Sequence, residues 1–222
     1  MMLYVLSLCN YLDVCTYLVN LYVFYKYIII LLGKSIFSFD GTANTIVDLR
    51  STLQSVQGNN PRSISFMIQT ATTAYANIVF TGSNEAWKFF GICINCGGAT
   101  SGILVIDAWG NYISSNGKAV NDGLWHTVLV AYDGTTLSIY VDGRLDSTAT
   151  NWNAGGFTAT IASTVNTVGN SGNYLGVGRD GSSAKWIGSL KNVLFYDYVI
   201  SNSYALANSY QFAGSIIYNS GN

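Results

Sequence analysis

The sequence predicts an all-β protein, a sandwich of antiparallel strands, preceded by an N-terminal hydrophobic, transmembrane helix. After residue 34, apolar and polar residues alternate over short segments, which is the period of a half-buried strand. Turn dipeptides such as Asp133-Gly134 and Asp142-Gly143 separate these segments and favour tight connections between antiparallel strands. The region also shows no helical repeat, so helices do not account for its apolar residues.

Residues 14–33 read VCTYLVNLYVFYKYIIILLG and are predicted to cross a membrane as a helix. At about 1.5 Å per residue, this length matches a hydrocarbon layer of about 30 Å. Its one charge, Lys26, costs roughly 2.5 to 3.5 kcal/mol at the bilayer centre, but it can snorkel and the apolar neighbours offset it. A cleaved signal peptide fits less well, because no basic segment precedes the apolar stretch. A buried β hairpin and a mistaken gene start are the alternatives to a membrane anchor at residues 1–34.

Residues 35–212 are predicted to form one β-sandwich, and residues 213–222 form a C-terminal tail. The predicted strands are residues 63–69, 103–106, 125–132, 137–141, 174–177 and 190–196, separated by clusters of Gly, Asn and Ser. Within the first of them, Ile64, Phe66 and Ile68 share one face. The sequence contains neither an internal repeat nor a second β domain.

Residues 125–143 read WHTVLVAYDGTTLSIYVDG, which resembles the central hairpin of laminin G-like domains in the concanavalin A-like lectin/glucanase superfamily. Four segments on either side of this hairpin also resemble the family: FDG at 39–41, LGVG at 175–178, WIGSLKNV at 186–193 and FYDYVIS at 195–201. The resemblance covers about residues 35–212. It implies a jelly roll of two packed antiparallel sheets that binds glycans or proteins and cleaves polysaccharides only in some branches of the superfamily.

The chain's only histidine, His126, lies at the start of the 125–132 strand. Nucleophilic or acid–base catalysis at a lone histidine needs a Ser or Cys within hydrogen-bond reach and usually a carboxylate that orients the ring. The alternation instead places His126 with Val128, Val130 and Tyr132 on the apolar face of the strand. We therefore expect a half-buried structural histidine and predict no catalytic residue.

Glycoside hydrolysis requires two carboxylates, about 5 to 5.5 Å apart for retention or 6.5 to 9.5 Å apart for inversion. The chain has a single glutamate, Glu85, and its aspartates are scattered and mostly lie in Asp-Gly turns. The acidic cluster that glucanases of this superfamily carry on one strand is absent from the sequence. We expect a protein that is not an enzyme, with a degenerate glycoside hydrolase as an alternative.

Calcium is the one cofactor that the resemblance allows, because laminin G-like domains often hold this ion at the rim of the sandwich. Oxygen ligands from loops suit such a hard cation. Asp107, Asp122, Asp133 and Asp180 lie in predicted loops, but their spacing matches no local calcium motif. Turn formation accounts for aspartates at such positions, so we assign no metal ligand.

Two segments combine an aromatic ring with amide side chains in glycine-rich surroundings. They supply the candidate binding residues Trp109, Asn111 and Tyr112, and Asn151, Trp152 and Asn153. Aromatic rings stack on the apolar faces of sugars, and amides hydrogen-bond the hydroxyl groups. The alternative is that the two tryptophans cap the ends of the core.

Cys93 and Cys96 have C-x-x-C spacing, but the sequence offers no second pair or nearby histidine to complete a zinc site. A local disulfide at a strand end and two free thiols are both open. The net charge of −1, without a run of basic residues, excludes the electrostatic footprint of a nucleic-acid binder.

No Asn-x-Ser/Thr sequon occurs in the chain. Either the β domain does not pass through a eukaryotic secretory lumen, or the protein is prokaryotic or viral. We expect a membrane-tethered, non-catalytic lectin-like module that recognises a glycan or a protein, at the cell surface or on a virion. The alternative is a structural virion or envelope protein that uses the sandwich for protein–protein contacts.

Overall fold

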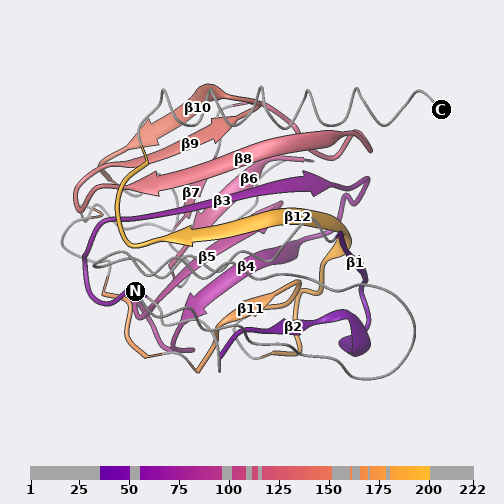
Figure 1. The fold of residues 1–222 in the computed structure, drawn as a ribbon, viewed down its shortest axis with the longest axis horizontal. Helices are drawn as coiled ribbons and strands as arrows, with labels where there is room; N and C mark the ends of the chain where they lie inside the picture. Colours follow the sequence, from indigo (N-terminus) through magenta and orange to yellow (C-terminus); the bar gives the residue numbers. More distant parts are fainter. Residues whose placement is uncertain are drawn as a thin grey trace, which may run out of the picture.

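The protein is an all-β sandwich of two six-stranded antiparallel sheets, which Figure 1 shows stacked on one another. The structure, a computed structural model, describes residues 36–50, 56–96, 102–108, 112–114, 117–151, 161, 166–169, 171–178 and 181–200. In these ranges helical structure is confined to the short 3₁₀ turn η1 (Ala43–Thr45) and to the single residues Cys96 and Ile161. The all-β two-sheet architecture is therefore confirmed.

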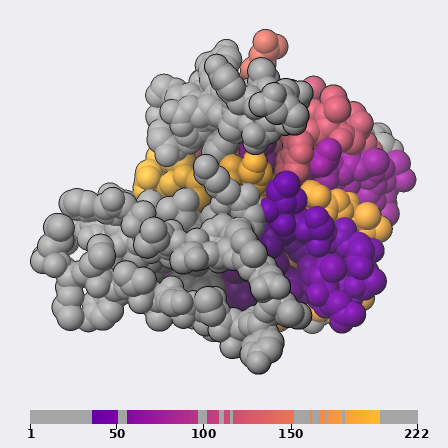
Figure 2. All heavy atoms as spheres, turned by 45° about the vertical axis from the view of Figure 1, so that its right-hand side comes forward, coloured from indigo at the N-terminus to yellow at the C-terminus, as the bar shows by residue number. Residues whose placement is uncertain are grey.

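Sheet A contains the strands that the sequence predicted best. It consists of β1 (Phe37–Asp40), β12 (Ile187–Tyr196), β3 (Arg62–Gln69), β8 (Trp125–Tyr132), β9 (Leu137–Val141) and β10 (Arg144–Ala149), in this spatial order. The predicted strands 63–69, 125–132, 137–141 and 190–196 correspond to β3, β8, β9 and β12. Figure 2 shows the first described segment, in indigo, against the yellow β12, with which β1 pairs.

Sheet B contains the strands that the sequence predicted poorly. It consists of β2 (Val47–Asp48), β11 (Tyr174–Leu175), β4 (Ala76–Gly82), β5 (Phe89–Ile94), β6 (Leu104–Asp107) and β7 (Tyr112–Ser114), in this spatial order. β4 and β5 were not predicted, because every residue of both is buried, including the polar Asn77 and Thr81, so no alternation marks a solvent face. The predicted strand 103–106 corresponds to β6, displaced by one residue.

The predicted strand 174–177 is shorter in the structure and ends at Leu175. Gly176 adopts a φ of 80°, and its N–H donates to the carbonyl of Ile78. A Cβ at this position would lie 2.3 Å from the ring of Phe39, so only glycine allows β1 and sheet B to approach so closely.

The hydrophobic core fills the space between the sheets. Ile64, Phe66 and Ile68 of sheet A belong to the same buried cluster as Ile78 and Ile92 of sheet B. Burying a side chain of this size contributes roughly 1.5 to 3 kcal/mol relative to leaving it exposed. The core therefore holds the two sheets together. The loops at the two ends of the sandwich lie outside it and can carry polar side chains.

The predicted membrane anchor at residues 14–33 lies outside the described residues, as does the tail at 213–222. Within the ranges that the structure describes, no helix is both long and apolar enough to cross a bilayer.

Candidate functional site

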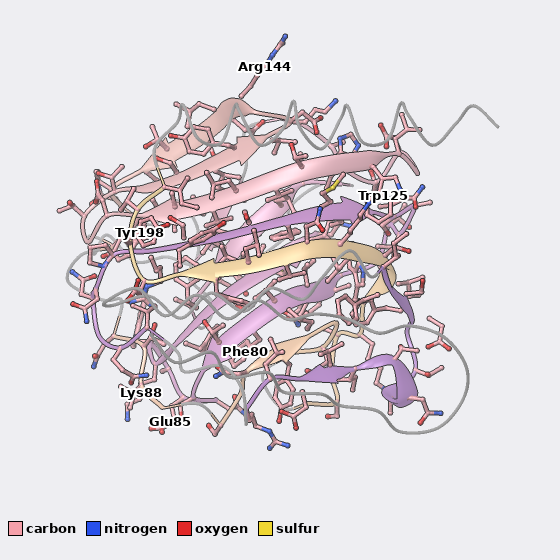
Figure 3. All side chains as sticks on the ribbon, viewed as in Figure 1. Phe80, Glu85, Lys88, Trp125, Arg144 and Tyr198 are labelled. Carbon is pink, nitrogen blue, oxygen red and sulfur yellow. A yellow bond between two sulfur atoms is a disulfide. The ribbon has the colours of Figure 1, made fainter. Side chains whose placement is uncertain are left out.

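The two ends of the sandwich carry different polar side chains. At the Arg62 end, β3 begins and β8 ends; at the His126 end, β3 ends and β8 begins. Figure 3 shows Tyr198 at the first end and Trp125 at the second. Loops from both sheets meet at each end, so each is a candidate recognition surface.

The predicted binding residues are only partly within the described structure. Trp109, Asn111, Trp152 and Asn153 lie outside the described residues. Tyr112 begins β7, opposite Asp107, and is half-buried. Asn151 follows β10 and is exposed. Tyr112 therefore belongs to an edge strand of sheet B, whereas Asn151 lies beyond an edge strand of sheet A.

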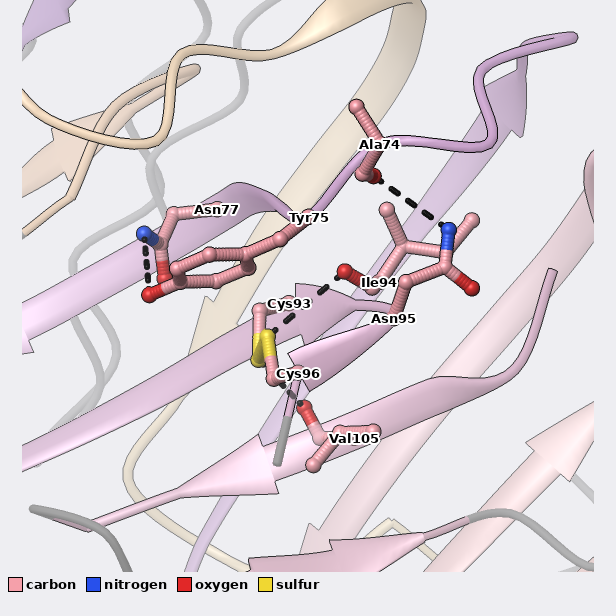
Figure 4. Close-up of a disulfide and its surroundings, with 8 residues drawn as sticks. All are labelled: Ala74, Tyr75, Asn77, Cys93, Ile94, Asn95, Cys96 and Val105. Atoms are coloured by element: carbon pink, nitrogen blue, oxygen red, sulfur yellow. Dashed lines mark hydrogen bonds between the residues drawn. A yellow bond between two sulfur atoms is a disulfide. The ribbon is translucent and has the colours of Figure 1, made fainter. Parts of the chain in front are cut away.

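Tyr112 packs against a small buried cluster of Cys93, Cys96 and Val105. The two cysteines form a disulfide, shown in Figure 4, so the disulfide alternative from the sequence is the one that the structure contains. Cys93 lies in β5 opposite Asn77 of β4 and Val105 of β6. The disulfide thus marks the part of sheet B where strands β4 to β6 lie side by side.

On the β4 side of the disulfide, the loop of residues 70–75 presents an exposed aromatic ring. We call this segment the Tyr75 loop; the Tyr75 side chain is 52% exposed although it directly precedes a fully buried strand. Its hydroxyl accepts a hydrogen bond from Nδ2 of the buried Asn77 at 3.3 Å (Figure 4). An exposed ring held by a buried amide is an arrangement suited to ligand contact.

Side chains and backbone from other segments hold the Tyr75 loop in place. Nδ2 of Asn95 donates to the carbonyl of Ala74 at 3.2 Å, and Nδ2 of Asn121 donates to the carbonyl of Thr72 at 3.1 Å. Within the loop, the hydroxyl of Thr72 accepts the N–H of Ala74 at 3.3 Å. Asn95 adopts a φ of 58°, a left-handed conformation that asparagine tolerates better than most residues. The loop backbone is therefore ordered before any ligand arrives.

A second polar cluster at the same end surrounds His126, which is 4% exposed. Its Nδ1 lies 2.9 Å from Oδ2 of Asp142, and its Nε2 lies 2.9 Å from Oδ1 of Asp122. Lys118 Nζ lies 3.8 Å from the same Asp142 oxygen. His126 was expected to be half-buried and is almost fully buried, and the sequence did not indicate that carboxylates contact both ring nitrogens.

These carboxylates favour the charged form of the imidazole. The pKa of His126 is raised, chiefly by the hydrogen bond to Asp142, against the opposing effect of burial and with help from Asp122. The pKa of Asp122 is lowered by the backbone N–H of Leu124 and then by His126. Burial disfavours the charge of Asp142, but hydrogen bonds from His126 and from the N–H of Thr127 outweigh it and lower its pKa.

Other acidic residues have partners that account for them locally. Glu85 pairs with Lys88 at 2.7 Å in an exposed turn at the Arg62 end. The Asp133 carboxylate accepts the N–H of Thr136 at 2.6 Å, which is the turn function expected of it. Asp180 lies outside the described residues. Within the described ranges, no group of three or more His, Cys, Asp or Glu side chains could hold a metal ion.

Sequence reasoning missed both features of the His126 end. Tyr75 precedes Asn77 by two residues in a run of small residues, which is the same ring-and-amide pattern that indicated Trp109 and Trp152. Tyr75 could therefore have been predicted as a binding residue from the sequence. The pairing of His126 with Asp142 could not, because it depends on the register of the β8–β9 hairpin.

Comparison with known proteins identifies the fold family. The family model for laminin G-like domains of the concanavalin A-like lectin/glucanases superfamily matches residues 40–204. No curated protein matches the chain by sequence.

Several solved structures share the fold at low sequence identity. The NanB sialidase from Streptococcus pneumoniae superposes with a TM-score of 0.55 and 16% identity over 79% of this chain and 27% of the sialidase. A GH54 α-L-arabinofuranosidase superposes with a TM-score of 0.53 and 11% identity, over 72% of this chain and 37% of the enzyme. The SAP-like pentraxin from Limulus polyphemus superposes with a TM-score of 0.51 and 16% identity, over 78% of this chain and 80% of the pentraxin. This chain thus spans well under half of the two enzymes, and the likeness concerns the sandwich alone. With the family match over residues 40–204, it follows that the chain belongs to the concanavalin A-like lectin/glucanase superfamily as a laminin G-like domain.

Proposed function

We propose that the protein is a non-catalytic, lectin-like module that binds glycan on the Tyr75 ring. The observation that carries this proposal is the combination of exposure and order. The ring is 52% exposed and its hydroxyl is hydrogen-bonded to Asn77, while the loop backbone is hydrogen-bonded to Asn95 and Asn121. Membership of a superfamily named for its lectins supports the same ligand class.

The physical basis is stacking on a prepared surface. A sugar ring presents an apolar face that can cover an aromatic ring, and a tyrosine supplies contact area at a low cost in conformational entropy. Because the loop is already ordered, ligand binding loses little further backbone entropy. The low charge of the chain, 9% of residues, also favours a neutral ligand such as a glycan over a strongly charged polymer.

The test is a glycan array with the full chain, followed by affinity measurement on the glycans that bind. Tyr75→Ala should weaken binding by about 1 to 3 kcal/mol, roughly 5- to 150-fold, by analogy with aromatic stacking on nucleic-acid bases. Tyr75→Phe should retain most of the affinity, because it keeps the ring and loses only the hydroxyl contact with Asn77.

Tyr198→Ala is the matched control, since Tyr198 is 38% exposed at the opposite end of the sandwich. Unchanged binding by Tyr75→Ala, or equal losses in both alanine variants, would contradict the proposed site. Binding of a protein ligand with no glycan bound would replace the lectin function with a protein-recognition function.

The originally predicted residues remain a second proposal for the glycan contact. Tyr112 packs on the disulfide cluster of sheet B, and Asn77 lies opposite Cys93 in the same sheet. Trp109→Ala and Trp152→Ala belong in the same assay: a loss of affinity without loss of stability would place the contact there instead.

We also propose that residues 14–33 tether the module to a membrane. The support is the length and apolarity of this segment in the sequence. Fractionation of the full chain against a chain that begins at Ser35 tests it: the full chain should sediment with membranes, and the shorter chain should not.

A further inference from the structure

The His126 cluster is connected to the Tyr75 loop by a short path of hydrogen bonds. Asp122, bound to His126 at 2.9 Å, is followed by Gly123, whose N–H donates to the carbonyl of Thr70 at 2.9 Å. Asn121, on the other side of Asp122, donates to the same loop at the carbonyl of Thr72. The loop of residues 121–124 is therefore held by His126 on one side and holds the Tyr75 loop on the other.

The contacts of His126 require a specific protonation state. A neutral imidazole donates from one nitrogen only and presents a lone pair at the other, whereas an imidazolium donates from both. Both nitrogens lie 2.9 Å from carboxylate oxygens, which can only accept while ionised. A ring without its second proton would direct a lone pair at Asp122 or at Asp142, so one of the two contacts would be lost.

Among the residues that the structure describes, few charged groups surround His126. They are Asp122 on the 121–124 loop, Asp142 from the turn between β9 and β10, and Lys118 beyond Asp142. On β3 the residue opposite His126 is the neutral Ile68. Among the described residues, the ion pairs of His126 are with these two aspartates alone.

We propose that protonated His126 clamps the 121–124 loop to the β9–β10 turn, and that loss of this proton loosens the Tyr75 loop and weakens ligand binding there. The effect on ligand binding rests on the proposed glycan function, whereas the clamp is a property of the unliganded protein. The site would then bind more tightly in mildly acidic than in alkaline surroundings.

The first experiment uses the full wild-type chain without ligand. Because His126 is the only histidine, its ring proton and carbon signals in an NMR titration from pH 5 to 9 need no assignment. Hydrogen exchange at the Gly123 amide is followed in parallel and corrected for the pH dependence of intrinsic exchange. We expect protection of this amide to fall about two- to tenfold as the ring deprotonates, the effect of losing one hydrogen bond.

Two variants locate the effect. His126→Gln cannot be protonated in this range, so its Gly123 protection should be low and should not change with pH. Asp133→Asn alters a comparable turn aspartate at the Arg62 end and should keep the wild-type pH response. Wild-type protection that does not follow the histidine titration, or the same pH response in His126→Gln, overturns the clamp.

An oligosaccharide array read at pH 5.5 and pH 8.5 separates the two proposals. Array binding that weakens at pH 8.5 in the wild type but not in His126→Gln supports the coupling. Glycan binding that is lost in Tyr75→Ala yet equal at both pH values leaves the proposed function intact and overturns the coupling. Protection that follows the histidine, with no glycan bound at either pH, leaves the clamp intact and removes the lectin function.

Discussion

Arg62 is a buried cation whose hydrogen bonds go to neutral oxygens. It is 3% exposed, and its Nη1 and Nη2 donate to Thr167 Oγ1 at 2.6 Å and to the carbonyl of Gly58 at 2.7 Å. Burial lowers its pKa to about 10, which still leaves it protonated at neutral pH. The guanidinium also lies 5.5 Å from the ring centroid of Phe90 in sheet B. Arg62 thus joins the two sheets at the Arg62 end, through hydrogen bonds to neutral oxygens and a cation–π contact with the Phe90 ring.

Arg62→Ala should lower the free energy of unfolding by about 3 kcal/mol, because it removes these bonds and leaves the buried hydroxyl of Thr167 without the Arg62 donor. Arg144→Ala is the control, since Arg144 is exposed and points away from the sandwich (Figure 3), and it should change stability by less than about 0.5 kcal/mol. Urea unfolding of both variants measures the difference. Equal effects would mean that the Arg62 contacts contribute nothing specific.

His126→Ala should lower the free energy of unfolding by about 1 to 3 kcal/mol at pH 6, since it deletes a buried ring and two hydrogen bonds to charged partners. Thermal and urea unfolding measure this loss. A variant as stable as the wild type at this pH would show that the cluster does not stabilise the fold.

At the scale of elements, the disulfide fastens the end of β5 to its own following turn. Cys93 lies within the strand and Cys96 just after it, and both are buried beside Val105 of β6. A cross-link that closes a short loop restricts the unfolded chain less than one that closes a long loop. Its contribution should therefore lie at the lower end of the usual range for disulfides.

Replacing both cysteines, by Cys93→Ala with Cys96→Ser, should lower the free energy of unfolding by roughly 2 kcal/mol. Treatment of the wild type with dithiothreitol should produce a similar loss, whereas the double variant should not respond to the reductant. A wild type that is indifferent to reductant would show that the disulfide does not contribute to stability.

Across the whole molecule, the pH dependence of stability should follow a small set of groups at the ends of the sandwich. The raised pKa of His126 stabilises the fold below the unfolded-state value, and this contribution is lost as pH rises through the folded pKa. The lowered pKa values of Asp122, Asp133 and Asp142 stabilise the fold above their unfolded value, and this contribution is lost as pH falls through the folded values. The two limits define a range of greatest stability.

We therefore expect the free energy of unfolding to be greatest between roughly pH 4 and 6.5, the unfolded pKa values of aspartate and histidine. Urea unfolding at half-unit intervals from pH 3 to 9 measures the profile. In His126→Gln the decline on the alkaline side should disappear while the acid decline remains. A wild-type profile that rises from pH 6 to 8.5 would contradict the raised histidine pKa.

A chain that begins at Ser35 should fold as a soluble all-β protein, because the described strands between residues 36 and 200 already form two six-stranded sheets that pack on one another. Circular dichroism and a cooperative thermal transition would show this. An unfolded or insoluble product, from a full chain that is soluble without detergent, would mean that residues 1–34 belong to the core.

The sequence by itself determined the fold class and four of the six strands of sheet A, namely β3, β8, β9 and β12. β9 alternates along its whole length and β8 over its first four residues, and both end at Asp-Gly turns; these local signals depend only on neighbouring residues. The same reasoning failed for β4 and β5, since strands buried along their whole length lose the alternation that marks a solvent face.

The candidate site was decided by the tertiary structure. Local sequence identified His126 as buried and Asp142 as a turn residue, yet only the antiparallel register of β8 and β9 brings the two within 2.9 Å. Tyr75 is exposed on an ordered loop because Asn95 and Asn121, distant in the sequence, donate hydrogen bonds to its backbone. Strand pattern is a property of consecutive residues, whereas a site is assembled from loops that meet only when both sheets have packed.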